Sequence, residues 1–390
     1  MLTLIHHNPA LVVNGVLHID RKFLAGMQYY SDALNIPLTT IHPILNENEI
    51  IMDRVSIPVA ELNFGIVTVT GYSSAVSRDA LQNQINKSIL VYGFGMGFPQ
   101  IARRSQVPYI LTLEHDLSTK IAVTTNDVAN KVRRMVRTLR AVYEYYFIDV
   151  PAMKSAYSLH CNGFPAFDSS LHYNKNRLLY LDSRMSSDQV ISEAELNTRL
   201  SRLRQRRLRL LYTGRYEAIK GASDAVSVAI ECQRMGLDIE FHSFGQGSLR
   251  HEMKRMVRSA PSPDLIFIHD AIPYPELVQK SREFDIFVCC HVQSDPSCTY
   301  LETLGSGLPI VGYNNRMLKG VVDKSSAGFA VKHRSPVSVA QQIEILARDR
   351  QLLADMSLNA RAFSLKHTFE NEFDLRVSAI SEAYASFLKN

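Results

Sequence analysis

The sequence predicts an α/β protein that consists of two doubly wound, Rossmann-like domains. With 390 residues, the chain is too long for one ordinary core and fits two domains. Hydrophobic residues make up 46% of the chain and charged residues 21%, which is the mix of an ordinary globular protein. Short β-branched runs alternate with helical patterns in both halves, and this order is typical of parallel sheets covered by helices.

The N-terminal half, residues 1–180, carries the pattern of the first domain. We expect strands at Phe64–Thr70, Ser88–Tyr92 and Pro108–Leu113, and a helix at Asp127–Tyr146 with Thr125 or Asn126 as its N-cap. The apolar residues of this helix follow helical spacing: Val128, Val132, Met135, Val136, Leu139, Val142 and Tyr143. Its other side carries the cations Lys131, Arg133, Arg134, Arg137 and Arg140.

Residues 181–207 are polar and charged, with six arginines between Arg199 and Arg209, and we interpret this segment as a linker. The alternation then returns and predicts a second domain at residues 208–365. Its expected strands are Leu208–Thr213, Asp238–Gly245, Leu265–His269 and Asp285–Cys290. Its expected helices are Ser223–Gly236, Leu249–Arg258, Glu276–Glu283, Thr299–Gly305, Pro336–Arg348 and Gln351–Leu365. A final helix, Glu372–Leu388, lies in residues 366–390, a segment that we expect to pack back on the first domain.

Composition narrows the class of protein further. The five cysteines form neither a CxxC pair nor a disulfide framework, so reduced thiols are expected. The longest apolar stretches have the length of strands and fall far short of the roughly 20 residues that cross a bilayer. No secretory signal pattern begins the sequence, and we expect a cytoplasmic protein. The formal charge of +5 fits an anionic ligand, an anionic surface or no specific partner.

Two loops of the second domain are candidate ligand sites, because open parallel sheets bind ligands beyond the carboxyl ends of their strands. The first loop runs from Thr213 to Gly221. Gly214 and Gly221 permit tight turns, and Arg215 and Lys220 place two cations near a helix start, which suits a diphosphate. An ordinary surface loop with basic residues remains an equal alternative.

The second loop leaves the expected strand Asp285–Cys290 and enters the helix that starts near Cys298 and Thr299. The backbone amides of that first turn are available to phosphate or sugar oxygens. Glu302, one turn further on, is placed to accept hydrogen bonds from paired ribose hydroxyls. A carboxylate at such a position is also explained as an ordinary charge on the helix surface.

Together the two loops resemble the donor-binding motifs of family 4 glycosyltransferases, the large retaining group with the GT-B fold. Gly214, Arg215, Lys220 and Gly221 match a G-R-x-x-x-x-K-G motif. Glu302, Gly307 and Pro309 match the second half of an E-x7-E segment that ends in E-A-x-x-x-G-x-P. The resemblance covers residues 208 to about 335. It implies two Rossmann-like domains that face each other across a cleft, with the nucleotide sugar held by the second.

The resemblance also implies roles for individual residues. Arg215 and Lys220 would hold the donor diphosphate and stabilise the negative charge of the leaving group, as catalytic residues. His115, after the strand Pro108–Leu113, would be a catalytic contact to the donor sugar; a strand-end histidine satisfied by backbone is an equal alternative. The donor-binding set would comprise Gly214, Tyr274, Asp295, Ser297, Cys298, Thr299 and Glu302. Asn14, Gly15 and Asp20 stand where acceptor contacts are expected.

One position departs from the family pattern. The first glutamate of E-x7-E falls on Ser294, with Asp295 one residue later. Either Asp295 replaces that glutamate in a shifted loop, or the sugar is held in another way. A catalytically silent nucleotide-sugar-binding subunit is therefore one alternative function, and a nucleotide-sugar epimerase is another.

The function that the resemblance implies is retaining transfer of a hexose-type sugar from a UDP- or GDP-linked donor to a glycan or lipid-linked acceptor, in the synthesis of a bacterial surface polysaccharide. We expect no metal, because no D-x-D or metal-spaced His/Cys cluster occurs, and no cofactor besides the donor substrate. The basic helix region Lys131–Arg140 has two interpretations. It is a peripheral contact with anionic lipid at the inner face of the cell membrane, or a solvated helix face. Nucleic-acid binding is not expected, since no recognised binding fold accompanies the charge.

Overall fold

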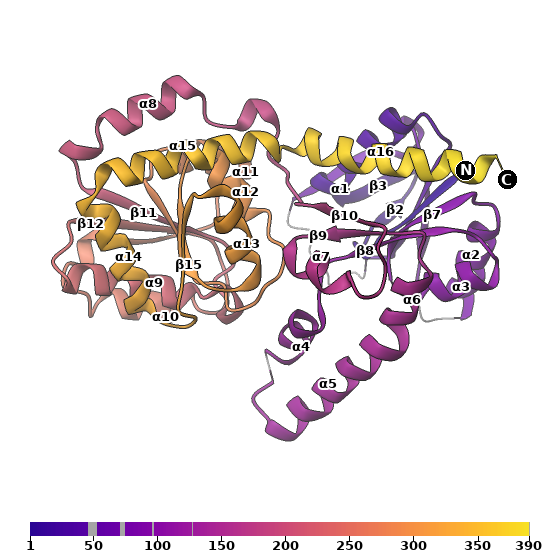
Figure 1. Cartoon of the computed structure of the whole chain (residues 1–390), viewed down its shortest axis with the longest axis horizontal. Coiled ribbons are helices and arrows are strands. Elements are labelled where there is room, and N and C mark those ends of the chain that lie inside the picture. Colours follow the sequence, from indigo (N-terminus) through magenta and orange to yellow (C-terminus); the bar gives the residue numbers. More distant parts are fainter. Residues whose placement is uncertain (46–52, 71–74, 96, 127, 390) are drawn as a thin grey trace. The chain divides into compact units, whose positions relative to one another are not determined.

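The computed structural model describes residues 1–45, 53–70, 75–95, 97–126 and 128–389. The chain divides into two compact units (Figure 1). Unit 1 comprises Met1–Tyr180 and Asn371–Asn390, and unit 2 comprises Leu181–Glu370.

Unit 1 is built on a parallel sheet whose described strands have the order β10-β9-β8-β7-β1-β4-β6. These strands are β1 Leu2–Ile5, β4 Leu38–Pro43, β6 Gly65–Val69, β7 Leu90–Phe94, β8 Tyr109–Leu113, β9 Ser158–Asn162 and β10 Arg177–Tyr180. From β1 the chain builds outward through β4 to β6, then returns to the other side of β1 with β7. The strand order therefore reverses between β1 and β7, which is where doubly wound sheets bind ligands.

Helices accompany this sheet, and buried helical residues such as Leu81, Phe98, Met153 and Ala166 belong to its core. They are α1 Arg21–Leu34, α2 Ala75–Asn86, α3 Phe98–Arg104, α4 Leu117–Thr125, α5 Lys131–Glu144, α6 Val150–Ser155 and α7 Phe164–Ser170. A π-helical segment, Tyr145–Asp149, connects α5 to α6.

The helix expected at Asp127–Tyr146 is shorter in the structure. Thr125 ends α4, and Asn126 is the C-cap of α4, so the expected N-cap at either residue was wrong. Asn130 caps α5 instead, because its side-chain oxygen accepts hydrogen bonds from the backbone N–H groups of the second and third helical residues, at 3.0 and 3.1 Å. Asp127 lies outside the described residues.

A small antiparallel sheet, which the sequence analysis did not anticipate, adjoins the start of the chain. It has the order β2-β3-β5, with β2 Leu11–Val13, β3 Val16–Asp20 and β5 Arg54–Pro58. Asn14 and Gly15 form the tight turn between β2 and β3, with φ angles of 49° and 74°. Two successive positive φ values match the right-handed twist of a hairpin, which is why Asn-Gly is favoured there.

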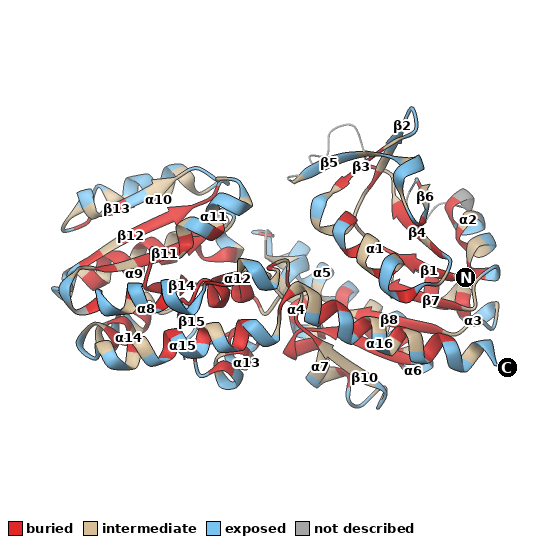
Figure 2. Cartoon of the chain, turned by 90° about the horizontal axis from the view of Figure 1, so that it is seen from above, coloured by how far each residue is buried: buried red, intermediate tan, exposed pale blue. Residues whose placement is uncertain are grey.

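Unit 2 contains a second parallel sheet, in which the described strands have the order β13-β12-β11-β14-β15-β16. The strands are β11 Leu208–Thr213, β12 Ile239–Phe244, β13 Ile266–His269, β14 Ile286–Cys289, β15 Ile310–Tyr313 and β16 Gly328–Val331. The helices are α8 Glu193–Ser201, α9 Ala222–Arg234, α10 Arg250–Val257, α11 Tyr274–Ser281, α12 Thr299–Gly305, α13 Arg316–Ser325, α14 Pro336–Arg348 and α15 Arg350–Lys366. In Figure 2 the strands of both parallel sheets are largely buried. The strand order of this sheet reverses between β11 and β14.

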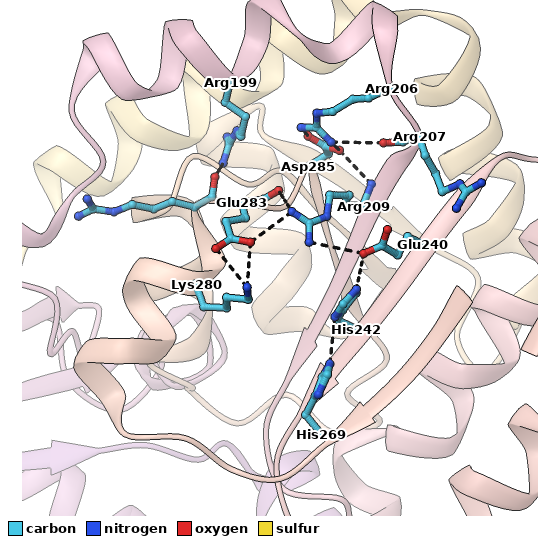
Figure 3. Close-up of polar contacts among 11 residues, drawn as sticks. Arg199, Arg206, Arg207, Arg209, Glu240, His242, His269, Lys280, Glu283 and Asp285 are labelled. Atoms are coloured by element: carbon cyan, nitrogen blue, oxygen red, sulfur yellow. Dashed lines mark hydrogen bonds and ion pairs between the residues drawn. The ribbon is translucent and has the colours of Figure 1, made fainter. Parts of the chain in front are cut away.

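Residues 181–207, which the sequence predicts to be a linker, contain helix α8 and belong to unit 2. Their arginines bind unit 2. Arg199 donates hydrogen bonds to the backbone carbonyls of Ser306 and Gly307 at 2.9 and 2.5 Å, and so satisfies the end of α12. Arg206 forms a two-pronged ion pair with the buried Asp285, at 2.8 and 2.6 Å (Figure 3). The basic run is therefore a structural feature of this unit.

Helix α16, Phe369–Leu388, returns the chain to unit 1. Phe373 packs on the rings of Tyr29 and Tyr30, with centroids 5.3 and 4.9 Å apart. Gly26 of α1 makes room for it, since a Cβ there would lie 2.8 Å from the ring of Phe373. Tyr384 accepts a hydrogen bond from the chain's amino terminus at 2.8 Å. These contacts make the last helix part of the core of unit 1.

We expect Phe373→Ala to lower the free energy of unfolding of unit 1 by about 3 to 5 kcal/mol, because a buried ring is replaced by a cavity. Leu375→Ala, on the same helix and 42% exposed, is the matched control and should change stability by about 0.5 kcal/mol or less. Urea denaturation followed by circular dichroism measures both. Equal stability of the two variants would show that Phe373 does not anchor α16.

Candidate functional site

Two loops of unit 2 meet at the point where its strand order reverses. One follows β11 and the other follows β14, and the two are in direct contact. The backbone N–H of Val292 donates to the carbonyl of Ile219 at 3.2 Å. Gly221 has φ +63°, and a Cβ on it would stand 2.0 Å from the carbonyl oxygen of Cys290. Only glycine fits this position, both for its conformation and for its space.

Lys220 and Asp295 join the two loops by an ion pair. Lys220 Nζ lies 2.9 Å from Asp295 Oδ2, and both side chains are largely buried. Burial alone would raise the pKa of Asp295, but the charge of Lys220 and its hydrogen bond to the carboxylate outweigh burial and lower that pKa. The other carboxylate oxygen of Asp295 is buried and has no hydrogen-bond partner among the described residues. A buried acceptor of this kind is available to a ligand hydroxyl.

Tyrosines hold the first loop in place around Arg215. The hydroxyl of Tyr212 donates to the carbonyl of Arg215 at 3.0 Å, and that of Tyr216 donates to the carbonyl of His269 at 2.7 Å. Gly214 directly follows β11 and has φ +147°. The side chain of Arg215 is exposed. The structure thus fixes the backbone at this position and leaves a cation at the surface of the site.

Glu302, the expected ribose contact, is paired with a residue that the sequence analysis missed. Arg184 Nε lies 2.5 Å from Glu302 Oε1, and the guanidinium of Arg184 stacks on the ring of Tyr274 at 3.9 Å. Tyr274 and Glu302 also line a small pocket of about 10 Å³ with Thr213, at the carboxyl end of β11. Its volume is close to that of one water molecule. Arg184 stands 118 residues before Glu302 in a segment expected to be a linker, and no motif points to it.

The remaining residues of the second loop have structural partners. Ser294, which occupies the position of the family's glutamate, accepts a hydrogen bond from the backbone N–H of Arg316 at 3.0 Å and so supports the start of α13. Ser297 donates to the hydroxyl of Thr299 at 3.2 Å, and the thiol of Cys298 lies 3.6 Å from Asp182. The expected helix start at Thr299 is confirmed, since α12 begins there.

His291 is a further residue of this site whose importance the sequence did not signal. It is buried beneath the loop, with its Nδ1 3.4 Å from the hydroxyl of Tyr300. Asn315 donates to the carbonyl of His291 at 3.2 Å. Burial, reinforced by the positive charge of Lys220, lowers the pKa of His291 to about 3. The ring is therefore neutral at pH 7 and supports the loop without adding charge.

His115 lies in unit 1, where it lines a pocket of about 240 Å³ beyond the carboxyl ends of β7 and β8. Lys120 also lines this pocket and forms an ion pair with Asp149 at 2.6 Å. Gln100 Oε1 and Thr112 Oγ1, on two lining residues, are buried and have no hydrogen-bond partner in the described part of the chain. The pocket thus offers polar groups to a ligand of modest size.

The expected acceptor contacts have other local roles. Asn14 and Gly15 make the β2–β3 turn, and the carboxylate of Asp20 caps α1 by accepting from the N–H of Lys22 at 3.0 Å. None of the three lines the pocket of unit 1. Gly95 and Gly97, from the glycine-rich run after β7, do line it, whereas Met96 lies outside the described residues. The acceptor role of Asn14, Gly15 and Asp20 stays a prediction.

Comparison with known sequences finds similarity in the part of the chain that holds this site. The family model "Glycosyl transferases group 1" matches residues 195–363, which include both site loops. An alpha-D-kanosaminyltransferase from Streptomyces kanamyceticus is 24% identical over 190 residues, 47% of this chain and 48% of the relative. A D-inositol 3-phosphate glycosyltransferase from Arthrobacter sp. (strain FB24) is 24% identical over 167 residues, 41% of this chain and 40% of the relative. The chain thus matches about half, or less, of the length of these relatives.

Solved structures resemble the chain over its whole length. Anabaena Alr3699/HepE in complex with UDP and glucose has a TM-score of 0.65 at 11% identity, covering 100% of this chain and 99% of that one. WaaG, a glycosyltransferase involved in lipopolysaccharide biosynthesis, has a TM-score of 0.63 at 11% identity, covering 97% and 99%. At such identity the likeness shows the fold, and it confirms the predicted GT-B class of two parallel α/β domains. The chain therefore has a GT-B fold, and its residues 195–363 match the model of the glycosyl transferases group 1 family.

Proposed function

We propose that the protein transfers a hexose-type sugar from a UDP- or GDP-linked donor to a glycan or lipid-linked acceptor, in the synthesis of a bacterial surface polysaccharide. The observation that carries the proposal is the Lys220–Asp295 pair, which joins two loops where the strand order of unit 2 reverses. Ligands of doubly wound sheets bind at this place. Two proteins of similar structure support the class of donor and product, since HepE was solved with UDP and glucose, and WaaG is involved in lipopolysaccharide biosynthesis.

In this proposal the donor diphosphate lies against Lys220 and Arg215. Lys220 is held by Asp295 and exposes little surface, whereas Arg215 is exposed and can reach a ligand. Two cations stabilise the negative charge that grows on the diphosphate as the sugar–phosphate bond breaks, in the role that a metal ion plays in other enzymes. The unpartnered oxygen of Asp295 accepts a hydrogen bond from a hydroxyl of the donor sugar. Asp295 thereby takes over from the glutamate that Ser294 replaces.

The ribose is assigned to Glu302. Its carboxylate already accepts from Arg184, and a carboxylate has lone pairs left for two ribose hydroxyls. The ion pair with Arg184 holds the carboxylate of Glu302 in one orientation, and the ring of Tyr274 stacks on the guanidinium of Arg184. Ser297, Cys298 and Thr299, at the start of α12, complete the proposed donor-binding set with Gly214.

The transfer exchanges one bond at the anomeric carbon for another and moves one proton. An acceptor hydroxyl oxygen bonds to the anomeric carbon, the bond from that carbon to the diphosphate breaks, and the hydroxyl proton passes to the departing diphosphate. We propose that the new bond forms on the face that the diphosphate leaves, so that the anomeric configuration is retained. The 240 Å³ pocket of unit 1, with His115 on its wall, is the proposed acceptor site. We place the reaction in the cytoplasm. The five cysteines of the protein are free in the structure, as expected for a reducing compartment.

Donor binding is tested by thermal unfolding in the presence of UDP-, GDP-, ADP- and TDP-sugars. A ligand at 100 times its dissociation constant adds about 2.7 kcal/mol to the stability of the native state. We expect UDP- or GDP-sugars to raise Tm. Arg215→Ala should weaken binding roughly 10- to 100-fold, because one charged hydrogen bond is lost. Lys254→Ala, an exposed cation on α10, is the matched control and should bind like the wild type.

The outcomes separate the alternatives. If no nucleotide sugar raises Tm, the donor site is not where we propose it. If binding occurs and survives Arg215→Ala unchanged, the site lies elsewhere in the chain. If binding occurs but no acceptor extract and no water ever receives the sugar, the protein is a silent binding subunit.

The Lys220–Asp295 pair should also govern acid stability. We expect Lys220→Met to lower the free energy of unfolding of unit 2 by about 3 kcal/mol at pH 7, because Asp295 is left buried without its partner. The lowered pKa of Asp295 means that the pair stabilises above about pH 4, the pKa of an unfolded aspartate. That stability is lost as the pH falls through the lower folded pKa. Urea denaturation between pH 7 and pH 3 measures both effects.

Lys319→Met provides the control for this experiment. Lys319 pairs with Asp323 at 2.6 Å, but both side chains are 55% exposed, so its loss should change stability by about 0.5 kcal/mol or less. A Lys220→Met protein as stable as the Lys319→Met protein would contradict a buried pair at this site.

The stereochemistry is tested without knowledge of the acceptor. Slow hydrolysis of the bound donor uses water as the acceptor, and proton NMR taken at once identifies the anomer released. We expect the anomer of the donor, from a retaining mechanism, and a rate at least tenfold lower for Arg215→Ala than for Lys254→Ala. Release of the opposite anomer would contradict retention, while leaving the donor site in place.

A further inference from the structure

Helix α5 and the π-helical segment that follows it expose a continuous apolar surface, which we call the apolar face. It comprises Val132, Met135, Val136, Leu139, Tyr143, Tyr146 and Phe147. They stand at positions i, i+3, i+4, i+7, i+11, i+14 and i+15, which places them on one side of the helix. Relative exposures run from 51% at Tyr146 to 68% at Phe147. An amphipathic helix ordinarily buries such a face on its own sheet, and α5 does not.

The helix has little support from the rest of unit 1. Within α5, only Ala141 is buried, and Figure 1 shows the helix projecting away from the sheet beside α4. A helix of 14 residues that packs mainly along α4 gains little stability from the rest of its domain. The cost of exposing seven large apolar side chains adds to this. Both observations indicate that α5 acts against something outside this chain.

The charges of α5 identify the class of that partner. Lys131, Arg133, Arg134, Arg137 and Arg140 are all exposed, and the helix has no acidic residue before Glu144. Glu144 is itself paired with Arg140 at 2.8 Å and with Lys120 at 3.7 Å. Helices with an apolar face and a purely cationic remainder lie in the interface of anionic membranes, where each cation contributes on the order of 1 kcal/mol.

Aromatic residues mark the end of the same face. Tyr143 and Phe147 stack with their ring centroids 4.8 Å apart, and both rings are exposed. Tyrosine is favoured at the boundary between water and lipid headgroups because one end of its ring is apolar and the other polar. In the described part of the chain, no helix combines the length and apolar character needed to cross a bilayer.

We propose that α5 and residues 145–148 dock unit 1 on the surface of an anionic lipid bilayer. The helix lies parallel to the surface, with the apolar face below the headgroups and the five cations among the lipid phosphates. A second copy of this chain fits less well, because pairing two apolar faces would bring together two helices that each carry five cations and one carboxylate. The proposal is independent of the proposed transfer reaction, since docking needs neither donor nor acceptor.

The test is co-sedimentation of the full chain with vesicles of phosphatidylcholine alone and of phosphatidylcholine mixed with phosphatidylglycerol. We expect binding to the mixed vesicles at least roughly a hundredfold stronger than to the neutral ones, and weaker binding at high salt. Changing three apolar residues at once, Met135→Gln, Leu139→Gln and Phe147→Gln, should reduce binding roughly a hundredfold. The triple change Lys131→Gln, Arg133→Gln and Arg140→Gln should reduce binding to a similar degree.

Matched controls exist on other helices. Val337→Gln, Leu358→Gln and Leu388→Gln remove three exposed apolar residues elsewhere. Lys254→Gln, Arg255→Gln and Arg258→Gln remove three exposed cations from α10 and its C-cap. Both controls should bind vesicles like the wild type. Because every altered side chain is exposed, circular dichroism should show all four variants folded.

Three results would overturn the proposal. The first is a wild-type protein that does not bind mixed vesicles. The second is binding that the α5 variants and the controls reduce equally, which would indicate a diffuse charge effect. The third is a wild-type dimer in sedimentation velocity that the apolar variant converts to a monomer without any vesicle binding, since the face would then join two copies of the chain.

Discussion

Asp285 fixes the two central strands of unit 2 to each other. Its carboxylate is 1% exposed, accepts two hydrogen bonds from Arg206, and accepts a third from the backbone N–H of Arg209 at 2.9 Å. Arg206 stands just before β11, and Asp285 just before β14. Loss of one partner of a buried ion pair costs about 3 to 5 kcal/mol, so a shift of β14 against β11 is strongly disfavoured. A shift by one residue would also turn every side chain of the strand to the wrong face.

The alignment of β11 and β14 by Asp285 also determines the geometry of the candidate site. Its two loops leave the opposite ends of the same two strands, so the alignment set by Asp285 decides where Lys220 and Asp295 meet. Within the site, the close approach of Gly221 to Cys290 sets the distance between the loops. The network in Figure 3 continues from Arg209 through Glu240 and His242 to His269, and so extends the same alignment to β12 and β13. The paired strands β11 and β14 and the short loops that follow them thus position the opposite charges of Lys220 and Asp295.

The sequence predicted unit 2 better than unit 1. The strand Leu208–Thr213 and the helices Thr299–Gly305 and Pro336–Arg348 were predicted to the residue, because apolar periodicity and turn residues mark their ends. β9 was missed because its buried residues include His160 and Asn162, which give no apolar signal. Arg184 was missed because its role depends on a contact with Glu302 that only folding creates. Periodicity likewise showed that α5 has an apolar side, but it holds no information on what covers that side.

The π-helical segment Tyr145–Asp149 makes one nearly continuous rod of α5 and α6. Tyr145, Ile148 and Asp149 of this segment, with Ala152 and Met153 of α6, form one wall of the 240 Å³ pocket. The other end of the rod is the exposed helix. Helices are stiff over such lengths, and a π-helical turn is the place where a helix bends most readily. A displacement of α5 would therefore move the pocket wall, because the bend that accommodates it lies among the lining residues.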